Sequence, residues 1–334
     1  MEQGNQNVFD VVITQESIFH YNRELLALLL RDRTTKQNII WATNDYAYLG
    51  FGYSDSDEIK VDYVTRRNGN MVRPRILKAL DTKADRTRDK AEVFTPSWIC
   101  NQQNNLVDRQ WFGREHIFNV ETDHSWQTIH EPVYFPTEHG RSWKDYVLAL
   151  RMEITCGEAP YLVSRYDTVS GERIPVSDRI GMLDRKLRIV SENCQTEELW
   201  LRYARKAYQS VYGYEYQGDN LLIARINLLS TFVEYYQEKF EKIPNDQWLR
   251  IIADVITWNL WQMDGLKAVV PLSCRAEVYE QFNLFGLVQQ EEECPGCRFR
   301  DIKRHNGTYC KIVDWTEKKR KEITYLSLLG GEKG

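Results

Sequence analysis

The segment between residues 196 and 229 constrains the fold most, because its pattern indicates a helix, a short strand, an acidic residue and a second helix. Its first part, TEELWLRYARKAYQ, places Leu199, Tyr203 and Ala207 on one helical face behind a threonine cap. The short strand VYGYE then ends at Glu215, before NLLIARINLL continues as a helix. In a doubly wound α/β fold, an acid at this place accepts hydrogen bonds from the ribose of a nucleotide cofactor. Taken alone, Glu215 is more typical of a surface or capping acid.

A second strand and turn lies upstream, in RMEITCGEAPYLVSRYD, which spans residues 151–167. The strand ends at Cys156 and Gly157, and a glycine at the end of a strand lets the backbone approach a ligand closely. The same residue is also typical of a plain turn. Together, the two segments predict an α/β protein with a ligand-binding turn.

Composition excludes several classes of protein. The chain has 334 residues, enough for one large domain with additions or for two domains. The longest aliphatic run, between residues 25 and 30, is too short to span a bilayer, and the first residues do not resemble a targeting segment. A cytoplasmic protein without membrane contact is therefore expected. Its seven cysteines are expected to be reduced thiols. Its net charge of -4 does not attract phosphate, so binding to nucleic acid would need a local basic surface or another subunit.

The N-terminal part is expected to form an α+β extension. Helical spacing of apolar residues extends over residues 16–31, and NIIWATNDYAYLGFGY indicates an aromatic-rich strand and turn. The charged run DTKADRTRDK, residues 81–90, is the candidate boundary.

Three segments in a fixed order carry a family resemblance. They are AEVFTPSWICNQQNNLVD, EITCGEAPYL and VYGYEYQGDNLLIARINLL. In this order they resemble motifs X, I and II of the gamma-class N6-adenine DNA methyltransferases of restriction-modification systems. The resemblance covers about residues 91–266. It implies a Rossmann-like, S-adenosylmethionine-dependent methyltransferase fold, with an N-terminal extension (1–90), a cofactor-binding domain (91–270) and a C-terminal segment (271–334).

The resemblance also implies roles for individual residues. Phe94 and Pro96 would pack near the cofactor, with Thr95 offering a hydroxyl; Glu153 would hold a water or the amino group of the methionine moiety. Glu215 would bind the ribose. The loop departs from the family pattern at residues 158–160, where a second glycine is missing. The cofactor residues implied are Phe94, Thr95, Pro96, Glu153, Thr155, Cys156, Gly157, Glu215 and Asp264.

The segment DVITWNLWQMDGL has two interpretations within this resemblance. In the first it is a degenerate catalytic motif, with Asn259 accepting a hydrogen bond from the target amino group of a flipped base. In the second it is the preceding motif III, in which Asp264 contacts the adenine of the cofactor. The second fits better, because both prolines and the aromatic residue of the catalytic motif are missing.

No NPPY-like motif occurs anywhere in the chain. The resemblance therefore predicts only the cofactor-binding half of a split methyltransferase, with an incomplete sheet. The catalytic motif would lie on a second chain, and double-stranded DNA would bind to the complex. The alternatives are a decayed, non-catalytic methyltransferase fold that serves as a binding or specificity subunit, and a complete enzyme acting through Asn259 on another substrate.

A cysteine pair in ECPGCRFRDIKRHNGTYC is a candidate metal knuckle, because two thiolates that flank a tight turn can share one tetrahedral ion. His305 and Cys310 are expected to complete a structural zinc site with Cys294 and Cys297, and Cys274 is a more distant alternative. Two free thiols in a reduced loop are the competing interpretation. A thioredoxin-like redox role would need a helix after the pair, and none is expected. The final residues, from TYCKIVDW onwards, predict a two-stranded hairpin.

Overall fold

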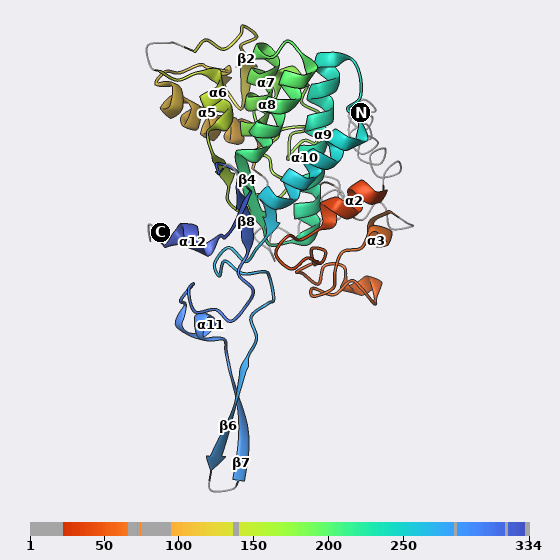
Figure 1. Cartoon of the computed structure of the whole chain (residues 1–334), viewed down its shortest axis with the longest axis vertical. Helices are drawn as coiled ribbons and strands as arrows, with labels where there is room; N and C mark the ends of the chain where they lie inside the picture. Colours follow the sequence, from red (N-terminus) through yellow and green to blue (C-terminus); the bar gives the residue numbers. More distant parts are fainter. Residues whose placement is uncertain are drawn as a thin grey trace.

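A three-stranded parallel sheet lies at the centre of the computed structural model (Figure 1). The structure describes residues 23–65, 72, 74, 95–135, 140–283, 286–317 and 320–330. The strand order is β3-β4-β5, and the register pairs Glu153 with Gly213 and Glu215 with Gln262. The strands are β3 (Arg151–Glu153), β4 (Val211–Glu215) and β5 (Leu260–Gln262).

Pairs of helices connect these strands, as parallel pairing requires. Between β3 and β4 lie η3 (Val176–Asp178), α7 (Met182–Asn193) and α8 (Glu197–Gln209). Between β4 and β5 lie α9 (Gly218–Phe240) and α10 (Asp246–Asn259). The side chain of Thr196 caps α8 and that of Asn245 caps α10. The helix, strand and helix predicted between residues 196 and 229 are therefore confirmed, and so is the α/β class.

The two faces of the sheet pack against different parts of the chain. Val211 and Leu260 point into the large core formed with the helices. Tyr214 and Trp261, which alternate with them along the strands, pack in a second cluster with Ile312 of the C-terminal hairpin. The sheet is thus covered on both faces, as parallel sheets usually are.

The N-terminal part packs into the main core rather than forming a core of its own. Leu25 and Leu29 are buried in the same cluster as the helices α9 and α10. The amide of Gln262 accepts a hydrogen bond from the Ile40 amide at 2.9 Å and donates one to its carbonyl at 2.8 Å. The elements here are α2 (Arg23–Leu30), η1 (Ala47–Leu49) and α3 (Val61–Thr65).

Some predictions for this part need correction or lie outside the described residues. The aromatic-rich stretch was expected to contain a strand, but turns, the short helix η1 and two isolated bridges, Arg31–Asn38 and Ile40–Glu58, replace it. Its aromatic rings pack on one another, with Trp41 and Tyr46 at a centroid distance of 4.7 Å. The proposed boundary at residues 81–90 lies outside the described residues.

A polar, buried network fixes the loop between β3 and α7. Arg165 and Arg179 each form an ion pair with Glu234 of α9, at 2.7 and 2.6 Å. All three side chains are almost fully buried, and the two guanidinium groups lower the pKa of Glu234 to about 2 although burial opposes its charge. The loop therefore belongs to the folded body.

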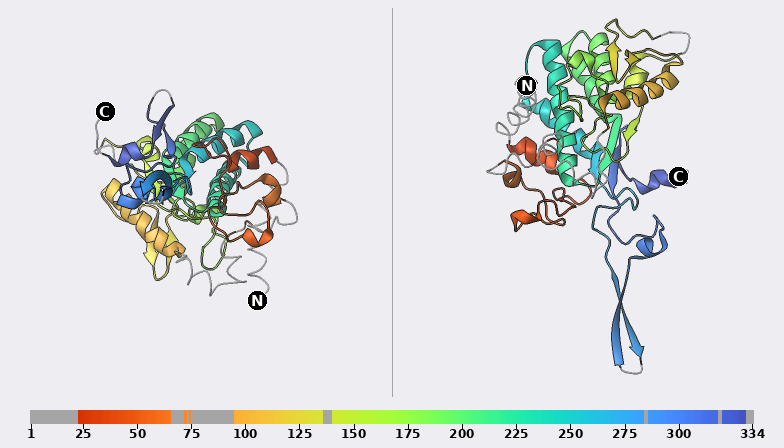
Figure 2. Two further views of the ribbon diagram at one scale, coloured as in Figure 1. Left: turned by 90° about the horizontal axis from the view of Figure 1, so that it is seen from below. Right: turned by 180° about the vertical axis from the view of Figure 1, so that it is seen from behind.

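The remaining helices cover one side of the body, and an arm projects from the other end (Figures 1 and 2). The elements before the sheet are α5 (Ser97–Phe112), β1 (Asn119–Thr122), β2 (Ser125–Thr128) and α6 (Trp143–Leu148). The arm is the antiparallel pair β6 (Glu277–Asn283) and β7 (Gly286–Glu292). These two strands were not predicted from the sequence. After it come α11 (Pro295–Phe299), β8 (Lys311–Asp314), β9 (Lys321–Thr324) and α12 (Leu326–Leu329), with β8 and β9 forming the predicted hairpin.

Among the described residues, no helix is both long enough and apolar enough to cross a membrane.

Candidate functional site

Two predicted acids meet at the carboxyl edge of the sheet. Glu153 ends β3 and Glu215 ends β4, and the carboxyl ends of neighbouring parallel strands lie at the same edge. Both side chains are buried, with 7% and 8% of their surface exposed. The edge therefore carries two nearby carboxyl groups with restricted access to water.

The loop after β3 is held against the end of β4. The amide of Cys156 donates to the carbonyl of Tyr214 at 2.8 Å, and the amide of Gly157 donates to the Glu215 carboxylate at 2.9 Å. Gly157 has a φ of +53°, which favours glycine, and no atom lies within 4 Å of the position that a Cβ there would take. The loop thus presents open space directly beside its contact with Glu215.

Cys156 and Thr155 serve the loop in different ways. Cys156 is buried, and a Cβ on Gly213 would lie 3.2 Å from its own Cβ, so the loop packs tightly on β4 at this glycine. Thr155 is exposed with a φ of +50°, and its hydroxyl donates to the carbonyl of Ile154 at 2.7 Å. Cys156 therefore anchors the loop, whereas Thr155 faces solvent.

Glu153 caps the turn that follows this loop. Its carboxyl group accepts hydrogen bonds from the amides of Leu162 at 3.1 Å and Tyr161 at 3.4 Å. Burial raises the pKa of Glu153 well above its ordinary value, and the charge of Glu215 raises it further against the effect of the two amides. A cation placed at this edge would favour the ionised form of Glu153.

The segment predicted to lie beside the cofactor packs against the region after β3. The Thr95 carbonyl accepts a hydrogen bond from the Thr168 hydroxyl at 2.6 Å, and the Asp167 carboxylate accepts one from the amide of Ser97 at 2.9 Å. Pro96 is the residue before α5. The structure thus brings Thr95 and Pro96 to the chain that continues from the loop, while Phe94 lies outside the described residues.

A groove of about 790 Å³ borders Pro96 and Asp167 and was not predicted. Its walls include Trp98 and His124, whose rings stack at a centroid distance of 4.7 Å, and Arg173. The sequence offered only a long connection rich in histidine here, and no spacing that could identify a groove.

Asp264 follows β5 and faces another cavity. Its carboxylate forms an ion pair with Lys267 at 3.2 Å, and its backbone forms a bridge with Val269. Both charged residues line a cavity of about 310 Å³ that also contains Cys274 and Cys297. Asp264 therefore lies just after the carboxyl end of β5 and adjoins the cysteine cluster.

Asn259 is at the opposite end of β5 from the two acids. Its buried amide nitrogen donates to the carbonyls of Tyr208 and Val211 at 3.0 and 2.9 Å. Its oxygen accepts a hydrogen bond from the Trp315 indole at 2.7 Å. Asn259 therefore connects secondary structure elements, and it lies away from the two acids at the carboxyl edge.

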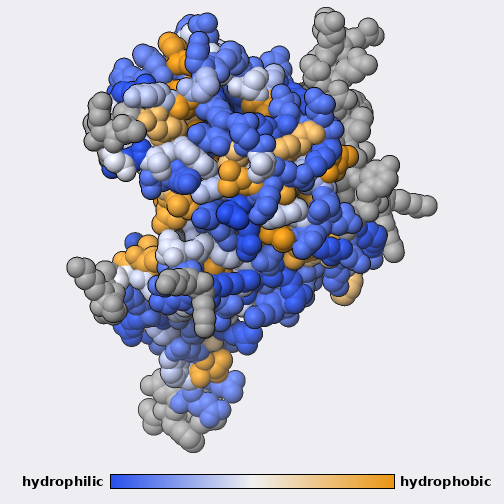
Figure 3. Space-filling model, turned by 45° about the horizontal axis from the view of Figure 1, so that its top comes forward, coloured by the Kyte–Doolittle hydropathy of each residue, from blue (hydrophilic) through white to orange (hydrophobic). Residues whose placement is uncertain are grey.

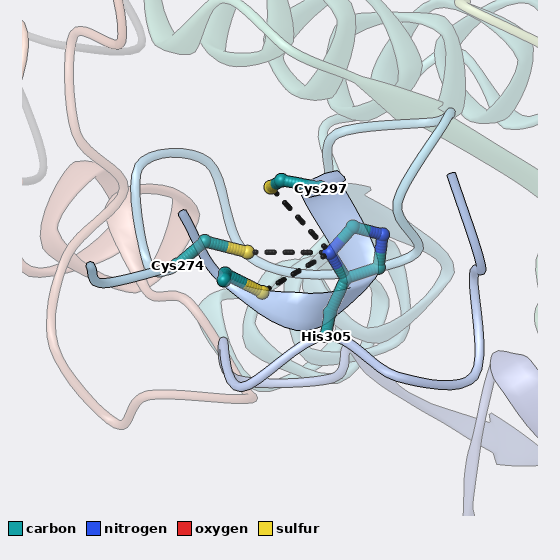
Figure 4. Close-up of side chains that lie close together, drawn as sticks. Cys274, Cys297 and His305 are labelled. Carbon is teal, nitrogen blue, oxygen red and sulfur yellow. Dashed lines mark hydrogen bonds between the residues drawn. The ribbon is translucent and has the colours of Figure 1, made fainter. Parts of the chain in front are cut away.

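Three cysteines and one histidine converge at the base of the arm (Figure 4). The Nδ1 atom of His305 lies 3.5, 3.6 and 3.7 Å from the Sγ atoms of Cys274, Cys294 and Cys297. All seven cysteines of the chain are free thiols. Cys294, Cys297 and His305 are thus brought together as predicted.

The fourth predicted ligand is corrected. Cys310 is fully buried among the apolar residues below the sheet, and its thiol donates to the carbonyl of Gln262 at 3.3 Å. Cys274 takes its place, although nineteen residues, including the whole arm, separate it from Cys294. A further correction concerns α11, because this five-residue helix begins inside the cysteine pair where no helix was expected.

Comparisons of the chain with protein-family models, with curated proteins and with solved structures found no match. A functional assignment must therefore rest on the chemistry of the sheet edge and on the motifs that meet there.

Proposed function

We propose that the chain is the S-adenosylmethionine-binding half of a split N6-adenine DNA methyltransferase of a restriction-modification system. The observation that carries this proposal is the contact between Gly157 and Glu215, which joins the two strongest sequence motifs at the carboxyl edge of a parallel sheet. Open dinucleotide- and nucleoside-binding sheets use this edge, with a strand-end glycine near one part of the ligand and an acid near the ribose.

The electrostatics of the edge support a cationic ligand. S-adenosylmethionine carries a sulfonium and an ammonium group, and Glu153 and Glu215 would attract both charges. Burial raises the pKa of Glu153, and the nearby charge of Glu215 adds to this effect, so a bound cation would stabilise its ionised form. Thr95 and Pro96 would close the site from the side of α5.

In this proposal, the residues of this chain position the cofactor and do not move protons. Glu215 would hold the ribose hydroxyls, the loop at Gly157 would let the methionine moiety approach the backbone, and Glu153 would orient that loop. Methyl transfer from a sulfonium depends chiefly on proximity and alignment of the acceptor nitrogen. The groups that bind the flipped adenine would come from the second chain.

The free edge of the sheet supports the need for that second chain. Within the described residues, β3 has a paired strand on one side only. Leu150 and Ile154 flank it with 57% and 64% of their surface exposed, and Leu150 and Met152 line an apolar groove of about 300 Å³. Figure 3 shows hydrophobic groups on the wall of a recess in the molecular surface. Unpaired strand edges with apolar flanks are typical association surfaces.

Reconstitution of methyl transfer tests the proposal. The purified chain would be mixed with the product of the adjacent reading frame, labelled S-adenosylmethionine and double-stranded DNA. We expect N6-methyladenine only when both chains are present. Methylation of DNA in the absence of this chain would contradict the split enzyme. So would a lack of methyl transfer with every protein encoded next to this chain.

One observation favours a second candidate, a non-catalytic protein with this fold. The amide of Asn259, the polar residue of the degenerate catalytic motif, is committed to backbone contacts and to Trp315. A chain that binds cofactor but supports no transfer with its neighbour would fit that candidate.

A further inference from the structure

The cysteine cluster joins the two ends of the projecting arm. Cys274 lies three residues before β6, and Cys294 lies two residues after β7. The strands between them pair along their whole length, from Glu277 with Glu292 to Asn283 with Gly286. Figure 4 shows Cys274, Cys297 and His305 pointing toward one another from three separate segments.

The geometry of the cluster fits a tetrahedral metal ion. Zinc binds thiolate sulfur at about 2.3 Å and imidazole nitrogen at about 2.0 to 2.1 Å, so the nitrogen and sulfur ligands of a tetrahedral site lie about 3.5 Å apart. The three distances from His305 Nδ1 are 3.5, 3.6 and 3.7 Å, and all four ligand atoms lie within 4.8 Å of one another. Three thiolates and one imidazole form a common structural zinc set.

Two glycines allow the ligands to approach. A Cβ on Gly296 would lie 2.5 Å from the ring of His305, and a Cβ on Gly307 would lie 3.1 Å from the Sγ of Cys274. Either side chain would push a ligand away from the cluster. The amide of Asn306 also donates to the Cys294 sulfur at 3.2 Å, a hydrogen bond that stabilises a thiolate.

The cluster is linked to the end of β5. His305 donates its amide to the Tyr309 hydroxyl at 3.0 Å, and Tyr309 forms a bridge with Val269, which itself pairs with Asp264. Lys267 and Arg275 line the same cavity as the three cysteines. A zinc ion with three thiolates and a neutral histidine has a net charge of -1. Lys267, which also pairs with Asp264 at 3.2 Å, lies in the cavity beside it.

We propose that Cys274, Cys294, Cys297 and His305 bind one structural zinc ion, which holds the base of the β6–β7 arm against the segment after β5. The ion joins positions 274, 294–297 and 305, so the orientation of the arm depends on it. This inference is independent of cofactor binding.

Metal analysis of the full-length chain tests the site. We expect about one zinc per chain, and cobalt exchanged into the site should give the ligand-field bands of a tetrahedral thiolate complex. Cys274→Ala and His305→Ala should abolish stoichiometric zinc. Gly296→Ala should weaken metal affinity on the order of tenfold or more, the usual scale when the surroundings of a ligand change.

Cys310→Ala is the matched control, because it removes a buried thiol only five residues from His305. We expect this variant to keep its zinc. Loss of zinc in Cys310→Ala with retention in Cys274→Ala would overturn the ligand set. Absence of zinc and cobalt binding in the folded, reduced wild-type chain would overturn the site itself.

Hydrogen exchange tests the structural role. Removing the metal with a chelator should increase exchange in β6, β7 and residues 264–276, and leave α9 protected. Equal exchange in the arm with and without metal would overturn the inference that the ion holds its base.

Discussion

Glu153 and Glu215 differ in what surrounds their carboxyl groups, although they end adjacent strands. Glu215 accepts hydrogen bonds from the Gly157 amide and, at 3.1 Å, from the Gln217 amide, which fixes both of its oxygens. Glu153 also accepts from two amides, those of Tyr161 and Leu162, but burial raises its pKa. A cationic ligand would therefore change the protonation of Glu153 more than its position.

Affinity for S-adenosylmethionine should rise with pH through the raised pKa of Glu153. Below that pKa the carboxyl group is neutral and attracts the cation weakly, whereas above it the ionised group attracts it strongly. Calorimetric titrations in buffers with different ionisation enthalpies should also detect proton release on binding. Glu153→Gln should flatten the pH profile and Glu198→Gln, at an exposed position on α8, should not. An affinity independent of pH in the wild-type chain would contradict this role.

The sequence predicted part of the site at the sheet edge and part of the cysteine cluster. The acids and the strand-end glycine could be found because they follow short strands, where a parallel sheet collects them. Cys274 could not be chosen over Cys310, since the ligand set depends on how an unrecognised arm folds back. Asn259 adjoins β5, but only the three-dimensional structure reveals that it lies at the end of the strand opposite the two acids.

Among the elements, α9 is joined by ion pairs to the loop after β3. Its Glu234 pairs with the buried Arg165 and Arg179, and at 3.7 Å with the partly exposed Arg173. Removing one member of such a network leaves charges buried without compensation, which typically costs about 3–5 kcal/mol.

Glu234→Gln should therefore lower the free energy of unfolding by about 3 kcal/mol at neutral pH. The pKa of Glu234 is lowered from 4.5 to about 2, so its stabilisation is complete above about pH 4.5 and disappears as the pH falls toward 2. Urea unfolding should show the difference between wild type and variant shrinking over that interval. Glu198→Gln, with 87% of the side chain exposed, is the matched control. If wild type and Glu234→Gln still differ by the same free energy of unfolding at low pH, ionisation of Glu234 is not the cause of the difference.

Element prediction succeeded where one face of a segment is apolar. Helix α8 has a buried stripe and a side-chain cap, and it begins where the sequence indicated. The arm was missed because it carries little apolar alternation: Val278 and Tyr279, adjacent residues of β6, are both exposed. A strand that contributes nothing to a core leaves a weak pattern in the sequence.

At the scale of the whole molecule, the described residues cover the sheet on both faces and at the β5 edge, and none of them forms a strand beside the outer edge of β3. Gln262 of β5 pairs with the backbone of Ile40, whereas the neighbours of β3 at positions 150 and 154 are apolar and exposed. An unpaired edge of this kind invites a strand from another chain.

Leu150→Lys should weaken association with the proposed second chain on the order of tenfold, or about 1.4 kcal/mol, because a charge would enter an apolar contact. Sedimentation or calorimetry with the adjacent gene product would measure the effect. Leu106→Lys is the control, since Leu106 is similarly exposed, at 53%, but lies on α5. Equal affinities for the two variants would exclude the β3 edge as the interface.

The central claim is that the carboxyl edge of this sheet binds S-adenosylmethionine. Calorimetric titration of the folded chain with this cofactor tests it most directly, using Glu215→Ala and the exposed control Glu198→Ala. We predict one binding site, an affinity at least about tenfold weaker in Glu215→Ala because charged hydrogen bonds to the ribose are lost, and no change in Glu198→Ala. Absence of binding by the folded chain, both alone and with the second chain present, would contradict the claim.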